Sequence, residues 1–485
     1  MRQEIRELTQ DAKIYGISTI IGRFLTFLLV PFYTHFISPS EMGIFANVYA
    51  YIAFLNIFYI CGLDVSFMKF RSEADAFQCK TIFSTAAWFS CILTIGLSLV
   101  LLALRRPFLT LMAVPLDRAD LFPYVLGILL FDTLSLIPYT AMRMERSTGA
   151  FTAIRMGGVG INLGLNLLFF IKLHLGITAI FAANMAGSLF SFLLLLPMTL
   201  KNIEWRLDGS CLRRMLGFGL PYLPATLASM IVQVIDRPIV QHLTNSWTLG
   251  LYQAGYKLGI FMMLVASMFQ FAWQPFFLSH ARDPKARILF ARVLTLFVVA
   301  TALIWAAVSL FIEEAARFLV DAQFLSGLVV TPIVLLAYLI YGLCVNFQAG
   351  LTIADKTRYF PLVTGASALV NVAANFLLIP RMGIIGAALA TLIAYIVMAA
   401  GLLYYSQRFY PIPYEFGKVG RILAVIGICA ALYYFLYFRG SLTTGIKAIM
   451  LLGFMTSLLA LRVVGRSEIS GMLESTGFWR PLQKK

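Results

Sequence analysis

Long apolar runs alternate with short polar segments along the whole chain. A helix that crosses a bilayer needs about 20 mainly apolar residues, and about fourteen runs approach that length between charged or turn-forming residues. The pattern predicts an all-α polytopic membrane protein. The predicted spans are Ile14–Ile37, Ile44–Leu63, Thr81–Leu104, Leu121–Ala141, Met156–Ile171, Gly176–Leu200, Leu216–Leu243, Leu249–Phe271, Ile288–Ile312, Leu328–Gly350, Phe360–Ile379, Ile384–Tyr405, Ile422–Phe438 and Ile446–Val464.

Composition indicates the same class of protein. Hydrophobic residues make up 60% of the 485 residues and charged residues 12%, whereas soluble proteins have about 45–50% apolar and about 25% charged residues. The net charge of +16 does not indicate nucleic-acid binding, because the basic residues are scattered over short loops and form no continuous face. The six cysteines and four histidines lack the spacing of a metal site, so we expect no metal and no cofactor.

The basic loops orient the spans. Lys and Arg accumulate in the cytoplasmic loops of membrane proteins, and roughly 27 of the 38 basic residues fall in one alternate set of loops. We therefore expect both termini in the cytoplasm and Trp247 outside. The outward loop Ile312–Gly327 is acidic instead. The basic loops are Arg2–Lys13, Lys69–Lys80, Arg143–Arg155, Lys201–Arg214, Arg282–Arg292, Lys356–Arg358, Arg408–Arg421 and the tail from Arg462.

Two stretches of the chain match without a gap. Val30–Tyr49 aligns with Arg237–Tyr256, so that Pro31 corresponds to Pro238 and Gly43 to Gly250. In the fifth and eleventh spans, a second match pairs Asn162 and Asn166 with Asn371 and Asn375, 209 positions later.

Six spans separate the copies, so the halves have the same orientation. Parallel repeats of this kind occur in secondary transporters, with the substrate path at the interface of the repeats. The predicted domains are an N-terminal lobe over 1–205, a C-terminal lobe over 206–410, and two further helices with a tail over 411–485.

Charged residues inside the predicted spans are the candidate functional residues. Arg23, Asp236, Arg237 and Lys257 each cost roughly 2.5–3.5 kcal/mol on insertion scales. Adjacent helical residues project about 100° apart, so we expect that Asp236 and Arg237 do not simply neutralise each other. Further polar candidates for cavity lining or ion coupling are Gln233, Gln241, Gln253 and Asp132.

Two interpretations of these charges remain open. Arg237 and Lys257 could snorkel to the outer interface, which lies within a few turns of each. Alternatively, Arg23, Arg237 and Lys257 line one hydrated cavity and bind an anionic substrate. The repeat does not require the charges, because Arg237 aligns with Val30. The asparagine pairs favour a simpler role, in which amides join neighbouring helices by hydrogen bonds of about 0.6 kcal/mol each.

Three runs carry a family resemblance: IDR…GLYQAGYKLG, FQFAWQPFFLSHARDPKA and NVAANFLLIPRMGIIGAALATLIAYI. They resemble the polysaccharide and O-antigen flippases of the multidrug/oligosaccharidyl-lipid/polysaccharide exporter superfamily. The resemblance implies two six-helix lobes around a central cavity, with two extra C-terminal helices. It also implies transport of an undecaprenyl-diphosphate-linked oligosaccharide from the inner to the outer leaflet by alternating access. Gly22-Arg23 is similar to the arginine pattern in the first helix of lipid II flippases.

The resemblance places the chain in the bacterial inner membrane, with a polysaccharide polymerase and glycosyltransferases of the same pathway as possible partners. Two alternatives stay open. A MATE-like antiporter of small molecules or cations is disfavoured by the first span, which has an arginine and no acidic residue. A membrane polymerase is disfavoured because no outward loop holds paired carboxylates or a metal cluster. The sequence therefore favours a transporter over an enzyme and does not identify a coupling ion.

Overall fold

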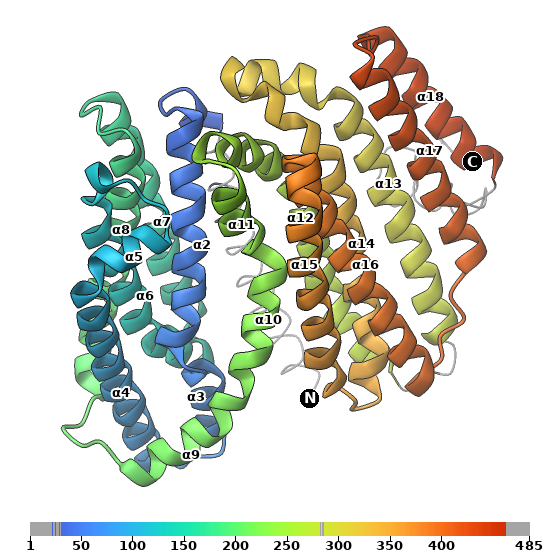
Figure 1. The fold of residues 1–485 in the computed structure, drawn as a ribbon. Helices are drawn as coiled ribbons and strands as arrows, with labels where there is room; N and C mark the ends of the chain where they lie inside the picture. The colour runs from blue at the N-terminus through green and yellow to red at the C-terminus, as the bar shows by residue number, and fades with distance from the viewer. Residues whose placement is uncertain are drawn as a thin grey trace, which may run out of the picture. The chain divides into compact units, whose positions relative to one another are not determined.

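A computed structural model describes residues 22, 25, 29, 31–281, 283 and 286–461, and within them all regular secondary structure is helical (Figure 1). The first predicted span and the chain beyond Leu461 lie mostly or wholly outside the described residues. The elements are α2 Pro39–Ile60, α3 Leu63–Ser72, α4 Ala76–Ala103, α5 Arg105–Leu111, η1 Leu116–Arg118, α6 Leu121–Met144, α7 Thr148–Ile171, α8 Ile177–Asn202, α9 Gly209–Gly219, η2 Leu220–Tyr222, α10 Leu223–Val234, α11 Asp236–Leu243, α12 Ser246–His280, α13 Ala286–Leu319, η3 Ala322–Val330, α14 Thr331–Ile353, α15 Tyr359–Met382, α16 Ile384–Phe409, α17 Phe416–Phe438 and α18 Thr444–Ala460.

The predicted all-α membrane architecture is confirmed. Within the described residues, twelve helical stretches are long and apolar enough to cross a bilayer, and α18 is a shorter apolar helix. The predicted starts at Leu121 and Ile384 coincide with the starts of α6 and α16. The predicted outward loop 312–327 is wrong in its first part, because α13 continues to Leu319. Ion pairs of Glu313 and Glu314 with Lys447 hold the carboxylates there.

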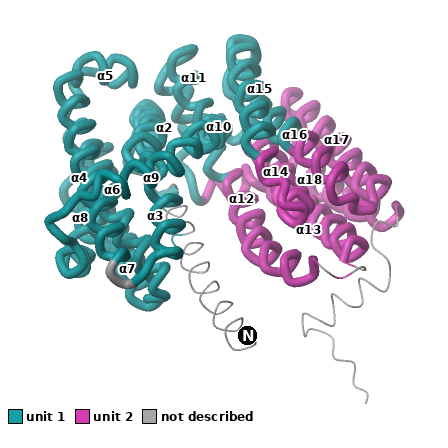
Figure 2. Tube along the Cα trace, turned by 90° about the horizontal axis from the view of Figure 1, so that it is seen from below, with its two compact units in different colours: residues 1–258, 319–330, 360–398 teal, residues 259–318, 331–359, 399–485 magenta. Residues whose placement is uncertain are grey.

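The helices form two compact units (Figure 2). Unit 1 consists of residues 1–258, 319–330 and 360–398, and unit 2 of residues 259–318, 331–359 and 399–485. Helices α12 and α16 pass from one unit into the other. These units follow the packing of the helices and differ in their boundaries from the predicted lobes, whose division therefore stays a prediction about the internal repeat.

Reciprocal contacts within unit 1 agree with that repeat. A Cβ atom on Gly43 of α2 would collide with the carbonyl of Ser246, the first residue of α12. A Cβ on Gly250 of α12 would collide in the same way with the carbonyl of Pro39, the first residue of α2. Matching patches that contact each other reciprocally are what a two-fold relation produces. The aligned glycines are therefore explained by a close helix crossing that tolerates no side chain.

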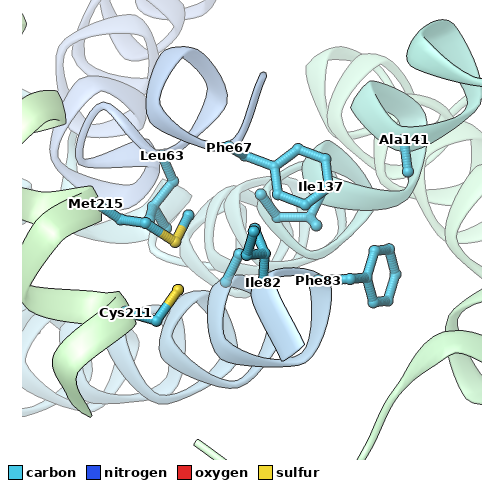
Figure 3. Close-up of a cluster of buried hydrophobic side chains, with 9 residues drawn as sticks. Leu63, Phe67, Ile82, Phe83, Ile137, Ala141, Cys211 and Met215 are labelled. Atoms are coloured by element: carbon cyan, nitrogen blue, oxygen red, sulfur yellow. The ribbon is translucent and has the colours of Figure 1, made fainter. Parts of the chain in front are cut away.

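A cluster of buried side chains fixes the start of the second half of the chain onto the first (Figure 3). Met215 and Cys211 of α9 pack in unit 1 against side chains of α3, α4 and α6. Asp208 caps α9, because its carboxylate accepts hydrogen bonds from the Ser210 and Cys211 amides at 2.8 and 3.0 Å. The Ser210 hydroxyl and these amides hold the pKa of Asp208 below its usual range. The other cluster residues are Leu63, Phe67, Ile82, Phe83, Ala86, Ile137 and Ala141.

In unit 2, an ion cluster joins α13 to α18. Lys447 has only 2% of its side chain exposed, and its Nζ lies 3.3 Å from Glu313 Oε2 and 2.9 Å from Glu314 Oε1. The turn before α17 is fixed separately, because the buried Tyr414 hydroxyl donates to Asn346 Oδ1 at 3.1 Å. Both contacts attach the last two helices to the rest of unit 2.

Candidate functional site

A cavity of about 490 Å³ opens within unit 1. Helices α2, α6, α7 and α8 form most of its wall, and Lys257 reaches it from α12. Among the described residues, the lining consists of Leu29, Tyr33, Phe45, Tyr49, Asp132, Ser135, Leu136, Tyr139, Thr140, Arg143, Phe151, Arg155, Gly158, Val159, Asn162, Leu163, Ile180, Asn184, Gly187, Ser188, Ser191 and Lys257.

Helical periodicity explains which side chains reach the cavity. On α6 the lining runs from Asp132 through the adjacent pairs Ser135–Leu136 and Tyr139–Thr140 to Arg143, a repeat of three to four residues that places them on one face. Small residues bring the wall helices together: a Cβ on Gly158 of α7 would lie 2.6 Å from Ser191 Oγ. A Cβ on Gly187 of α8 would lie 2.7 Å from the Gly158 carbonyl oxygen. The α7–α8 crossing is therefore too close to accept a side chain at either glycine.

Among the described residues, four charged side chains line the cavity, three of them positive. Arg143 and Arg155 flank the turn at residues 145–147, and Lys257 comes from α12. Asp132 is exposed toward the cavity, and Ser188 lies near it in the lining. Within the described part of the chain, neither Asp132 nor Lys257 takes part in an ion pair. The described part of the wall therefore offers three positive charges and one carboxylate.

Neutral polar groups fill the remaining wall. Tyr33 and Asn162 of the lining are joined by Asn166, which is fully buried and not part of the lining: the Tyr33 hydroxyl donates to Asn166 Oδ1 at 3.1 Å, and Asn166 Nδ2 donates to Asn162 Oδ1 at 2.7 Å. The Asn184 amide donates to the Tyr49 hydroxyl. Among the described residues, no group of three or more His, Cys, Asp or Glu side chains could hold a metal ion. The cavity thus suits an anionic, hydrogen-bonding ligand.

The structure separates the predicted site residues. Lys257 and Asp132 line the cavity, whereas Asp236 and Arg237 lie in a buried network that is not part of its lining. Arg237 still lies close enough to Lys257 for the two positive charges to interact. Arg23 lies outside the described residues. The role of Arg23, Arg237 and Lys257 in substrate binding stays a prediction.

The expectation that Asp236 and Arg237 do not neutralise each other is wrong. Arg237 Nη1 lies 2.8 Å from Asp236 Oδ1, and it also donates to the Gln233 carbonyl at 2.5 Å. The guanidinium stacks on the Tyr256 ring at 4.5 Å, while Tyr252 donates to the other carboxylate oxygen of Asp236. The predicted single span Leu216–Leu243 is broken at Ile235, so Asp236 starts a new helix. The Asp236 carboxylate also accepts a hydrogen bond from the Arg237 amide at 3.0 Å.

The glutamines of the predicted site lie in other surroundings. Gln233 is exposed and contributes its carbonyl to Arg237. Gln241 is buried and donates to Ser246 Oγ at 2.8 Å, which links the end of α11 to the start of α12. Gln253 is 4% exposed, and neither its Oε1 nor that of Gln241 has a hydrogen-bond partner among the described residues. None of the three is part of the cavity lining.

Sequence reasoning missed Arg143 and Arg155 as site residues. They were counted as loop charges, because the predicted fourth span ends at Ala141 and the predicted fifth span begins at Met156. In the structure, α6 continues to Met144 and α7 begins at Thr148, so both arginines are helical. A signal was present: Arg155 precedes Gly158 and Asn162 at three- and seven-residue steps, on the same helix face.

Known proteins share this fold. The lipid II flippase MurJ in an inward closed conformation is similar over 95% of this chain and 99% of that chain, with 15% identity and a TM-score of 0.73. An inward-facing multidrug resistance MATE family transporter of the MOP superfamily is similar over 80% of this chain and 94% of that chain, with 12% identity and a TM-score of 0.65. The Vibrio cholerae MATE transporter VcmN in the bent form covers 84% of this chain and all of its own, with 15% identity and a TM-score of 0.54.

These likenesses establish the fold, and the sequence establishes the family. No curated protein matches the chain. The model of one family, described as polysaccharide biosynthesis protein, matches residues 33–338, which is more than half of the 485 residues. Together with the apolar helices, this match identifies a multi-pass membrane protein that belongs to the polysaccharide biosynthesis protein family.

Proposed function

We propose that the protein is a flippase that carries an undecaprenyl-diphosphate-linked oligosaccharide from the inner to the outer leaflet by alternating access. The observation that supports it is the cavity of unit 1, which Arg143, Arg155 and Lys257 line together with polar uncharged groups and Asp132. The family membership and the fold shared with a lipid II flippase agree with it. The activity is transport, and no bond of the substrate is made or broken.

Electrostatics gives the physical reason for the cations. A diphosphate must leave water to cross a region of low dielectric, where an uncompensated charge is costly. Arginine binds phosphate oxygens in a bidentate manner, whereas lysine acts as a point charge. Hydroxyl and amide groups on the wall can replace the water that surrounds the sugars. The lipid tail can remain in the bilayer while the head group passes through the protein.

The proposed location is the bacterial cytoplasmic membrane, with both termini in the cytoplasm. This orientation makes the turn between α11 and α12 extracytoplasmic, where Thr244 is exposed. In an otherwise cysteine-free chain, Thr244→Cys should react with an impermeant thiol reagent in intact cells. Glu145→Cys, in the turn after α6, should react only after the membrane is permeabilised. The reverse pattern would overturn the orientation.

The function itself is tested by locating the lipid-linked oligosaccharide in a deletion strain. An impermeant lectin added to spheroplasts should find no lipid-linked units until the membrane is permeabilised, and the wild-type gene should restore their accessibility. Complementation with Arg143→Gln plus Arg155→Gln should fail at normal protein level. Lys172→Gln, an exposed cation after α7, is the matched control and should complement.

Other outcomes of the same assay identify other functions. Unpolymerised units that are accessible outside in the deletion strain would indicate a polymerase and end the flippase proposal. A MATE-like antiporter is the second candidate, and one observation favours it: the Asp132 carboxylate faces the cavity and could bind a cationic solute. In that case, the deletion strain would accumulate a lipophilic cation such as ethidium while its surface polysaccharide stayed normal.

A further inference from the structure

The cavity of unit 1 has two chemically different ends. Arg143 and Arg155, here called the arginine end, flank the turn at residues 145–147. Asp132 lies eleven residues before Arg143, which corresponds to about 16 Å along α6. Tyr139 lies between them, within electrostatic reach of both Arg155 and Asp132. The two arginines and Asp132 therefore occupy separate parts of the same cavity wall.

The other end gathers uncharged hydrogen-bonding groups around the carboxylate. Ser188 lies near Asp132, and Asn184 donates to the Tyr49 hydroxyl, which lies within electrostatic reach of Asp132. We call Asp132, Tyr49, Asn184 and Ser188 the carboxylate end. All four side chains line the cavity, and within the described part of the chain Asp132 has no cation paired with it.

These two ends differ in the ligand groups that they attract. A diphosphate is attracted to the two arginines and repelled by an ionised Asp132. A carboxylate accepts strong, charge-assisted hydrogen bonds from hydroxyl groups. An amide and a tyrosine hydroxyl can each donate or accept a further hydrogen bond. Clustered hydroxyls of a carbohydrate therefore match the carboxylate end, and phosphate oxygens match the arginine end.

We propose that the carboxylate end binds hydroxyl groups of the sugars nearest the diphosphate and determines which glycan the protein transports. This proposal rests on the flippase function and names the part of the substrate that is read. The volume of about 490 Å³ lies in the range of about 300–1,000 Å³ that is typical of sites for drug-sized ligands. It encloses only the first sugars, so the remainder of a longer oligosaccharide lies outside the selective contacts.

Binding measurements with two probes test the proposal. The purified full-length protein in nanodiscs is titrated with undecaprenyl diphosphate, and separately with the undecaprenyl-diphosphate-linked oligosaccharide extracted from a host that carries the gene. The wild type should bind the glycosylated lipid at least about tenfold more tightly, as expected for charge-assisted hydrogen bonds to sugar hydroxyls. Asp132→Ala should remove this preference and leave the affinity for undecaprenyl diphosphate unchanged or increased.

Further variants separate the two ends of the cavity. Arg143→Gln should weaken the binding of both probes, because both contain the diphosphate. Asn184→Ala should reduce the preference for the glycosylated probe without weakening the other. Asp132→Asn conserves the volume and keeps the test valid should the alanine variant fail to fold. Asp117→Ala is the matched control, since Asp117 is an exposed carboxylate outside the cavity lining.

The possible failures are distinguishable. If Asp132→Ala and Asn184→Ala lowered the affinity for both probes equally, or changed neither affinity, the sugar site would be overturned and the flippase proposal would stand. Equal affinity of the wild type for both probes would have the same consequence. A wild-type protein that binds neither probe would overturn the flippase function and the sugar site together.

Discussion

Two cations of neighbouring helices, Arg237 of α11 and Lys257 of α12, have opposite surroundings. Arg237 is 7% exposed, and its guanidinium is held by Asp236, the Gln233 carbonyl and the Tyr256 ring. Lys257 lines a cavity and has neither a hydrogen bond nor an ion pair among the described residues. In the sequence the two residues look alike, because each interrupts an apolar helix and each aligns with an apolar residue of the first half.

The difference shows that the role of a charged side chain in a membrane helix depends on its interaction partners, and not on how unusual a charge is at that position. A buried charge that is paired and hydrogen-bonded supports the local structure, and removal of its partner leaves an uncompensated ion. A charge that faces a cavity without a protein partner is available to a ligand. Arg237 therefore belongs with the structure of the α10–α11 break, and Lys257 belongs with the cavity.

The largest effect is expected from Arg237→Ala. It leaves Asp236 buried without its ion pair, and a broken buried pair costs about 3–5 kcal/mol in the free energy of unfolding. The amount of folded protein in the membrane should fall, as measured by fluorescence-detected size-exclusion chromatography across a temperature series. The alignment with Val30 alone predicts a normal protein level instead, so this variant separates the two expectations.

The matched control for this variant is the double replacement Asp236→Asn plus Arg237→Gln, which removes both charges. It should recover much of the lost stability, because no unpaired ion remains. A full loss of transport by Arg237→Ala at wild-type stability would contradict the structural role and return Arg237 to the substrate site.

Lys257→Met should have the opposite effect. Since Nζ has no ion-pair partner among the described residues, the melting temperature should remain close to the wild-type value. Transport measured in the lectin assay should fall by about tenfold or more, because loss of a hydrogen bond to a charged group costs about 1.5–3 kcal/mol. Lys257→Arg should restore part of it. Unchanged transport in Lys257→Met would show that this cation does not bind the substrate, and the functional difference between Lys257 and Arg237 would then be lost.

The helical architecture followed from the sequence, because hydrophobic length and flanking charges determine a membrane span. The span starts at Leu121 and Ile384 were predicted correctly since polar or turn-forming residues precede both. The repeat was also visible, and the contacts of Gly43 and Gly250 show why those positions match. These features depend on local composition and on similarity between two stretches of the chain, and both properties can be read directly from the amino-acid sequence.

The site was predicted only in part, because pairing depends on backbone geometry that periodicity does not show. Adjacent helical residues project about 100° apart, yet the side chains of Asp236 and Arg237 reach each other at the start of α11. Arg143 and Arg155 were assigned to a loop because charges were used to end the spans. A charge near the end of a span can equally belong to a polar helix face, as Arg155 does on α7, where it shares a face with Gly158.

A smaller effect is expected from Lys447→Met in unit 2, where the charge is paired as in the Arg237 network. Glu313 and Glu314 have side chains that are 34% and 31% exposed, so water compensates them after the change. The loss in the free energy of unfolding should therefore be only about 1–2 kcal/mol. Lys418→Met, which breaks a pair at three-residue spacing with Glu415, is the control and should cost about 0.5 kcal/mol. Transport per folded molecule should not change in either variant.

The smallest effects are expected from the neutral pairs that the two halves share. Asn166 Nδ2 donates to the Asn162 carbonyl at 2.8 Å, and Asn375 Nδ2 donates in the same way to the Asn371 carbonyl at 2.9 Å. Both bonds lie within one helix, and even interhelical polar contacts in membrane proteins average only about 0.6 kcal/mol, so Asn375→Ala should shift the melting temperature only slightly. Asn166→Ala should shift it more, because Asn166 also accepts the Tyr33 hydroxyl. Both variants should transport normally per folded molecule. A tenfold loss in either would mean that these amides contact the substrate, and that a polar group with a protein partner can also take part in transport.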